Sequence, residues 1–118
     1  MAAMLSLAAL QPGESVLDLG CGDGRVLHAA LAWGAASVAG WELDAALCDA
    51  ARDTLARATR GTAQTAVVVC GDCRDAAADA AAADVVMLFV LPEGLDVLTP
   101  MVRAHAEAHA ARVRMRTA

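Results

Sequence analysis

The chain has 118 residues, which is enough for one domain with a modest core, and hydrophobic residues make up 58% of it while aromatic residues make up only 3%. The formal net charge is -5, and residues 1–102 hold all but one of the 14 acids and only five of the 9 arginines. An acidic body of this kind does not favour binding to a phosphate backbone, so a nucleic-acid partner is not expected.

The N-terminus and the hydropathy pattern argue against export and against insertion in a membrane. Residues 1–5 lack the basic segment that opens a signal peptide, and no apolar run approaches the ~20 residues of a membrane span. We therefore expect an intracellular protein, cytoplasmic or in an organelle. Such compartments keep thiols reduced, so free thiols are expected at Cys21, Cys48, Cys70 and Cys73.

Apolar spacing and Gly/Pro breakers predict alternating strands and helices. In chain order we expect a short helix at 3–10, a strand at 14–19, a helix ending at Gly34, a strand at 37–41, a helix at 45–60, a strand at 67–69, an alanine-rich helix or loop at 75–83, a strand at 84–90, a helix at 95–102 and the start of a fifth strand at 112–115. The strand at 84–90 is almost wholly apolar, as a central parallel strand should be.

The helix at 45–60 has a clear start signal. Asp44 stands where a capping side chain accepts a hydrogen bond from the first turn. Helical spacing then places Leu47, Ala51 and Leu55 on the inward face.

The turn after the first strand is rich in glycine. Gly20, Gly22 and Gly24 let the backbone bend sharply and let a ligand approach where a Cβ would clash. The helix that follows directs its free N–H groups at the turn, which is typical of a nucleotide site. A dinucleotide fingerprint would need its third glycine at position 25, which is Arg25. The pattern present is instead acid-x-Gly-x-Gly-x-Gly, starting at Asp18.

Glu42 stands at the end of the second strand, about twenty residues past the glycines, where an acid in a doubly wound sheet reaches ribose hydroxyls. A carboxylate can accept two hydrogen bonds from a vicinal diol. The alternatives are a surface acid or a helix cap shared with Asp44. The neighbouring residue, Trp41, is expected to pack against other side chains rather than to contact a ligand.

The pattern from Asp18 to Gly24 resembles motif I of the class I S-adenosylmethionine-dependent methyltransferases. From Met4 to Met115 the chain is similar to the first two thirds of a small member, closest to the protein-lysine-methyltransferase-like group, with Leu91-Pro92-Glu93 after the fourth strand. The resemblance implies a three-layer Rossmann-like, doubly wound parallel sheet with about four to five of the family's seven strands. We therefore expect one cofactor-binding domain at 1–118 that lacks the C-terminal strands, as a fragment, a truncated gene model or a chain completed by a partner.

The resemblance also implies the residues that bind S-adenosylmethionine. They are Asp18, Gly20, Cys21, Gly22, Gly24, Glu42, Asp72, which would receive the adenine amino group, and the pocket walls Leu43, Cys73 and Phe89. No residue stands out as a catalytic base, since Glu93 is more simply read as a helix-start acid. Cys70 and Cys73 spell C-x-x-C, but no second pair exists for a zinc site, so no metal is expected.

Three functions are compatible with these residues. The first is an S-adenosylmethionine-dependent methyltransferase with an unidentified acceptor, for which a protein lysine amine is one candidate because some relatives of that group methylate protein lysines. The second is a cofactor-binding module or fragment without methyl transfer. The third, a nicotinamide dinucleotide domain, is disfavoured by Arg25. A partner, or a second copy of the chain, is also expected at the sheet edge left uncovered.

Overall fold

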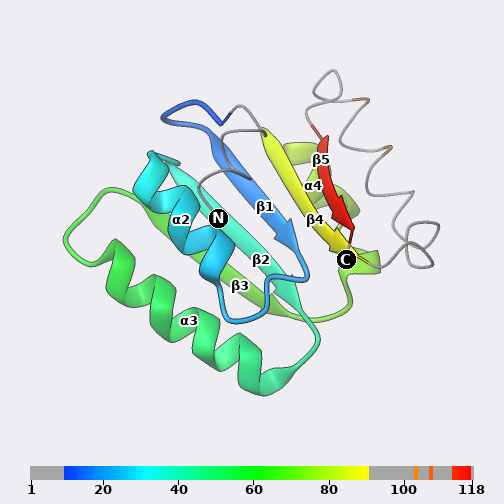
Figure 1. Cartoon of the computed structure of the whole chain (residues 1–118), viewed down its shortest axis with the longest axis horizontal. Coiled ribbons are helices and arrows are strands. Elements are labelled where there is room, and N and C mark those ends of the chain that lie inside the picture. The colour runs from blue at the N-terminus through cyan, green and yellow to red at the C-terminus, as the bar shows by residue number, and fades with distance from the viewer. Residues whose placement is uncertain (1–9, 91–102, 104–106, 108–112, 118) are drawn as a thin grey trace.

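The computed structural model describes residues 10–90, 103, 107 and 113–117 (Figure 1). The helices and strands are β1 (Ser15–Leu19), α2 (Arg25–Trp33), β2 (Ser37–Glu42), α3 (Ala45–Thr59), β3 (Thr65–Cys70), the 3₁₀ helix η1 (Cys73–Asp75), α4 (Ala77–Ala82), β4 (Val85–Val90) and β5 (Val113–Thr117). The helices expected at 3–10 and 95–102 fall outside the described residues, apart from Leu10, which is buried.

The sheet is parallel throughout and has the strand order β3-β2-β1-β4-β5. The chain moves outward from β1 through β2 to β3, and then returns to the other side of β1 for β4 and β5. The order therefore reverses between β1 and β4, which confirms the predicted doubly wound Rossmann-like fold. In such sheets ligands bind beyond the carboxyl ends of the strands, near this reversal.

Helices cover both faces of the sheet. Figure 1 shows α2 and α3 on one face and α4 on the other. A buried apolar cluster lies under α2 and α3, and a second, smaller one lies under α4. Together with the sheet they form the three layers that the resemblance implies.

Strand β1 runs between the two apolar clusters. Val16 belongs to the cluster under α2 and α3, whereas Leu17 and Leu19 belong to the cluster under α4. A strand enclosed in this way favours apolar side chains at every position. Asp18 is nevertheless only 4% exposed, so a carboxyl group is buried in the centre of the sheet.

Two local expectations need correction. Leu47 does not face inward, since it is 39% exposed; the buried residues of α3 are instead Cys48, Ala51 and Leu55. Strand β3 runs from Thr65 to Cys70 and is therefore longer than the 67–69 expected. Residues 75–83, expected as either a helix or a loop, contain the short helix α4. Asp44 caps α3 as predicted, because its side chain accepts the Leu47 N–H.

Strand β3 forms one edge of the sheet and is covered by an arginine of α3. The N–H groups of Thr65 and Gly71 donate inward, to the carbonyl oxygens of Ala36, just before β2, and of Glu42 at its end. Backbone groups alternate in direction along a strand, so those of residues 66, 68 and 70 turn away from β2. One of these is Val68, whose carbonyl oxygen accepts hydrogen bonds from Arg52 Nε at 3.3 Å and Nη2 at 2.9 Å. The outward carbonyl at the middle of this edge is thus already bonded.

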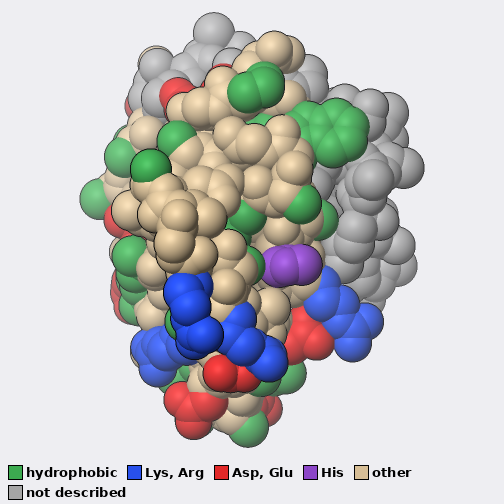
Figure 2. All heavy atoms as spheres, turned by 90° about the vertical axis from the view of Figure 1, so that its left-hand side faces the viewer, with side chains coloured by type: hydrophobic (Ala, Val, Ile, Leu, Met, Phe, Trp, Pro, Cys, Tyr) green, Lys and Arg blue, Asp and Glu red, His purple; other side chains and the backbone are tan. Residues whose placement is uncertain are grey.

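The outer surface of α3 carries charges of both signs. Arg57 pairs with Asp53 at 2.9 Å, and Arg52 lies 3.8 Å from Asp49. Figure 2 shows arginine and acidic side chains next to one another at the lower end of this face, where α3 lies. The face is therefore mixed in charge. None of the helices in the described ranges is long and apolar enough to cross a membrane.

A reciprocal pair of hydrogen-bonding side chains joins β1 to the start of β4. Asp84 Oδ2 accepts the Ser15 N–H at 2.9 Å and the Ser15 hydroxyl at 3.2 Å, while Ser15 Oγ accepts the Asp84 N–H at 2.9 Å. We expect Asp84→Ala to lower the free energy of unfolding by about 2 kcal/mol, because half-buried donors lose their acceptor. Urea denaturation measures this, with Asp53→Ala as the control, expected below about 0.5 kcal/mol. Equal losses in the two variants would contradict the prediction.

Candidate functional site

The loops that follow β1, β2 and β3 come together at the carboxyl edge of the sheet (Figure 1). These loops hold most of the residues that the sequence singled out. A cavity of about 490 Å³ lies elsewhere, against α4 and the first residues of β1, β2 and β3, including Ser15, Ser37 and Thr65. Because it opens at the amino ends of the strands, it is separate from the site at the carboxyl edge.

The glycine turn is held against the end of β2. Gly20, Gly22 and Gly24 have φ values of 87°, 57° and 90°, a region that favours glycine. The N–H groups of Gly20 and Cys21 both donate to the Trp41 carbonyl oxygen, at 2.8 and 3.0 Å. Gly24 has a second reason to lack a side chain, since a Cβ there would lie 3.3 Å from the Ala51 backbone. The turn is thus compact and is held by its own backbone hydrogen bonds.

Gly40 supports this turn, and the sequence interpretation did not single it out. A Cβ on Gly40 would lie 2.6 Å from Cys21 Sγ and 2.8 Å from Leu27 Cδ1, so Cys21 packs directly over β2 at this point. The signal was present, because a glycine inside a strand pattern often marks a close approach. The side chain of Cys21 is therefore buried in packing, and its backbone N–H and carbonyl oxygen are both bonded within the protein, to the Trp41 carbonyl oxygen and the Gly24 N–H.

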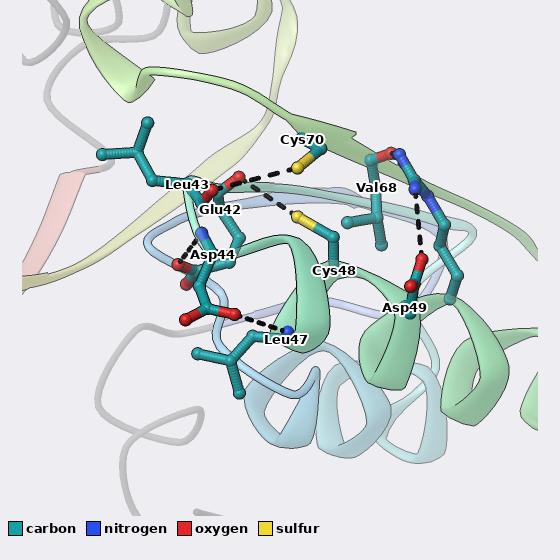
Figure 3. A network of polar contacts seen from close by, with 9 residues as sticks. Glu42, Leu43, Asp44, Leu47, Cys48, Asp49, Val68 and Cys70 are labelled. Atoms are coloured by element: carbon teal, nitrogen blue, oxygen red, sulfur yellow. Dashed lines mark hydrogen bonds and ion pairs between the residues drawn. The ribbon is translucent and has the colours of Figure 1, made fainter.

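The Glu42 carboxylate links the glycine turn after β1 to the loop after β2. Its Oε1 accepts the Gly22 N–H at 2.8 Å and its Oε2 accepts the Asp44 N–H at 3.0 Å. Figure 3 shows Glu42 at the start of the turn that leads into α3. The helix cap is Asp44, so Glu42 is not itself the cap. Each carboxylate oxygen has a further lone pair, so the group can still accept hydrogen bonds from a diol.

Asp18 is a buried carboxyl group without a hydrogen-bond donor among the described residues. It lies in register with Gly40 on β2 and Met87 on β4. Burial, and then the nearby charge of Glu42, raise its pKa to about 7. Two acids this close are costly in the free protein, and a cation placed beside them would relieve the repulsion. The pair therefore indicates a cationic ligand.

Asp72 is in the predicted place after β3 but already has a partner. Its Oδ1 accepts the Arg74 N–H at 2.9 Å, and its Oδ2 accepts Arg74 Nε at 2.8 Å and also contacts the terminal Nη2. These hydrogen bonds lower the pKa of Asp72. The guanidinium of Arg74 was not foreseen, because a pairing two residues apart depends on the short helix η1 that Asp72 caps.

The remaining predicted wall residues lie in different surroundings. Leu43 is 69% exposed at the carboxyl edge, whereas Cys73 packs against the cluster under α4. Trp41 packs against the same cluster, as expected, and its Nε1 donates to Asp79 Oδ2 at 2.7 Å. Phe89 lies in β4, but its side chain falls outside the described residues, as does all of Glu93.

A metal centre finds no support in the part of the chain that the structure describes, where no three His, Cys, Asp or Glu side chains gather. Cys70 is two residues after Val68 in β3, so its side chain lies on the same face of the sheet, toward α3. Cys73 instead packs on the α4 side. The two cysteines of the C-x-x-C pattern are thus on opposite faces of the sheet.

Comparison with known proteins agrees with this geometry. Residues 16–114 match the family model described as a methyltransferase domain. An RNA methyltransferase from Salinibacter ruber, solved with S-adenosylhomocysteine, is similar with a TM-score of 0.74 and 34% identity, over 85% of this chain and 63% of that one. The magnesium protoporphyrin IX methyltransferase of Synechocystis, solved with S-adenosylmethionine, shares the fold with a TM-score of 0.59 and 21% identity, over 92% of this chain and 50% of that one.

A curated sequence matches over a shorter stretch. The ribosomal protein L11 methyltransferase of Nitrosomonas europaea is 57% identical over 35 residues, which are 30% of this chain and 11% of that protein. The chain thus spans less than two thirds of each of these relatives. The glycine turn, the two acids beside it, the doubly wound sheet and the match over residues 16–114 together show that the chain belongs to the methyltransferase domain family.

Proposed function

We propose that residues 1–118 form one S-adenosylmethionine-binding domain of a methyltransferase. The observation that carries the proposal is Asp18, a buried carboxyl group with no donor among the described residues, beside Glu42 and under a glycine turn. S-adenosylmethionine is a sulfonium cation with a ribose diol and an adenine. The residues present fit such a ligand, since they combine negative charge, diol acceptors and a turn whose glycines carry no side chain.

Each part of the ligand has an assigned group in this proposal. Glu42 accepts hydrogen bonds from the ribose hydroxyls, and its own bonds to Gly22 and Asp44 hold it in place. Asp72 accepts the adenine amino group beside the Arg74 guanidinium. The glycine turn lets the amino-acid end of the ligand approach closely, because its glycines carry no Cβ. Leu43 offers apolar surface at the same edge.

The bound cofactor supplies an activated methyl group. The chain contributes by holding donor and acceptor in line, which can remove several kcal/mol of the barrier. Buried negative charge at Asp18 also favours a cation in a site with little water. No described residue is assigned as a base.

A protein amine is the acceptor that we propose. The match to a ribosomal protein methyltransferase supports it, as does the acidic body with mixed charges on α3. RNA is the second candidate acceptor, because the Salinibacter ruber relative is an RNA methyltransferase. Tritium-labelled S-adenosylmethionine, offered with purified ribosomal protein L11 or with ribosomal RNA, separates the two by which polymer takes up label. Binding without transfer to either would favour a cofactor-binding module.

The cofactor site itself is tested by calorimetry. We expect micromolar binding of S-adenosylmethionine and S-adenosylhomocysteine, and a loss of about a hundredfold in Glu42→Ala, since both ribose acceptors are removed. Glu42→Gln retains one acceptor oxygen and should lose less. Asp53→Ala removes an exposed acid of α3 and serves as the control, with unchanged affinity expected. Binding of NAD in preference to both ligands would contradict the proposal.

A further inference from the structure

The thiols of Cys48 and Cys70 meet beside the turn that carries Glu42 (Figure 3). Cys70 ends β3 and pairs in register with Glu42 at the end of β2. Its Sγ lies 3.9 Å from the Leu43 carbonyl oxygen, while Cys48 Sγ donates to the Glu42 carbonyl oxygen at 3.2 Å. Both thiols therefore contact the backbone of the segment that positions Glu42.

The two thiols lie at the same turn and differ in access to solvent. Cys48 is fully buried under α3, whereas Cys70 is exposed. Burial first, and the neighbouring Cys70 thiol second, raise the pKa of the Cys48 thiol to about 11; the charge of Glu42 acts in the same direction and that of Arg52 opposes it. The two sulfurs lie 3.2 and 3.9 Å from the carbonyl oxygens of consecutive residues, Glu42 and Leu43, so they are neighbours at the same turn.

Cys73 is not a competing partner for Cys70. It packs against the cluster under α4, on the other face of the sheet from Cys48. The C-x-x-C spacing in the sequence therefore does not identify the thiols that meet. The partner of Cys70 comes from α3, which places 21 residues between the two positions in the chain.

We propose that Cys48 and Cys70 form a dithiol oxidation site that a small disulfide of the glutathione type converts to an intramolecular disulfide. The Cys70 thiolate attacks one sulfur of the small disulfide, which forms a mixed disulfide and releases one thiol. The Cys48 thiolate then attacks the Cys70 sulfur and releases the second thiol. The chain gives up two electrons and two protons, and the two released thiols carry them. Intracellular disulfides are typically transient ones of this regulatory kind.

The disulfide also regulates the cofactor site, and this part rests on the proposed function. Once Cys48 has lost its proton, it can no longer donate to the Glu42 carbonyl oxygen, and the new bond draws α3 toward β3 at that turn. Because Glu42 also holds the N–H groups of Gly22 and Asp44, a shift of its backbone disturbs both loops. We expect the oxidised chain to bind S-adenosylmethionine about tenfold more weakly.

The experiment treats the reduced full chain with glutathione disulfide and follows its intact mass and its peptides. We expect the loss of two hydrogens and a crosslink between Cys48 and Cys70 that dithiothreitol reverses. Cys70→Ser, a surface change, should form no disulfide, and Cys48→Ala should stop at the mixed disulfide on Cys70. Cys73→Ser is the matched control and should crosslink like the parent chain. A Cys70–Cys73 crosslink, or a mixed disulfide that never resolves in the parent chain, would overturn the site.

Coupling to the cofactor site has two readouts. Calorimetry compares S-adenosylmethionine binding before and after oxidation, and hydrogen exchange at the Gly22 and Asp44 amides needs no ligand. Faster exchange at both amides with weaker binding supports the proposal. If the reduced chain binds no S-adenosylmethionine, the proposed function fails, but the exchange data still decide the coupling. Unchanged exchange at both amides in the oxidised chain overturns it.

Discussion

Replacing Gly40 by alanine is expected to lower the free energy of unfolding by about 3 kcal/mol and to weaken cofactor binding. The new methyl group would overlap Cys21 Sγ at 2.6 Å and Cys21 Cβ at 2.7 Å. Cys21 cannot move freely, because its N–H is bonded to the Trp41 carbonyl oxygen at the base of the glycine turn. Relief of the overlap must therefore shift the turn or β2. Thermal denaturation should show a decrease on the order of 10 °C.

Two further variants make this expectation specific. Gly71→Ala is the control, since a Cβ there would lie 3.4 Å from Trp41, which is an ordinary contact. Cys21→Gly combined with Gly40→Ala removes the overlap with Cys21 and leaves that with Leu27 Cδ1 at 2.8 Å, so the double variant should lose less stability than the two single changes added together. Strict additivity of the two changes would show that the overlap with Cys21 is not the cause.

The stability of the free protein is expected to fall as the pH rises from about 4 to about 8, by up to about 4 kcal/mol from Asp18 alone. The pKa of this carboxyl is raised from 3.8 to about 7 in the folded chain, by burial first and by Glu42 second. Between these two values the folded state holds a proton that the unfolded state has lost, so the free energy of unfolding falls steadily as the pH rises. Above about 7 the carboxyl is ionised in both states, and the fall ends. Asp18→Asn cannot ionise and should not show this slope.

Urea denaturation at about pH 3.5 and pH 8 measures the difference. Asp18→Asn should be more stable than the parent chain at pH 8 and close to it at about pH 3.5, where the carboxyl is protonated in the folded state and largely protonated in the unfolded state. Asp53→Asn, a change of an exposed carboxylate on α3, controls for the loss of one charge. A parent chain and an Asp18→Asn variant with the same pH dependence would show that Asp18 does not titrate as described.

The main features of the fold follow from local sequence patterns. Apolar runs separated by glycine and proline specify strands and helices over short windows, and Asp44 marks the start of α3 without reference to anything distant. The positions of Gly22 and Glu42 were also predictable, because a glycine turn and an acid at successive strand ends meet at one edge of a parallel sheet.

The details that depend on packing were not predictable in the same way. The inward positions of α3 are 48, 51 and 55, a spacing as helical as 47, 51 and 55, and hydropathy favoured the leucine. The buried thiol of Cys48 instead bonds to a carbonyl oxygen, which only the register of β2 and β3 brings within reach. The same holds for the contact of Gly40 with Cys21, which joins two segments separated by a whole helix.

The guanidinium of Arg52 on the Val68 carbonyl oxygen has a consequence for assembly. Exposed strand edges recruit other strands through their unpaired backbone groups. An incoming strand at β3 would have to displace two hydrogen bonds from a charged donor before it could form its own at the centre of this edge. Arg52 thus disfavours the pairing of a further strand with β3, and with it the growth of the sheet into a fibre on this side.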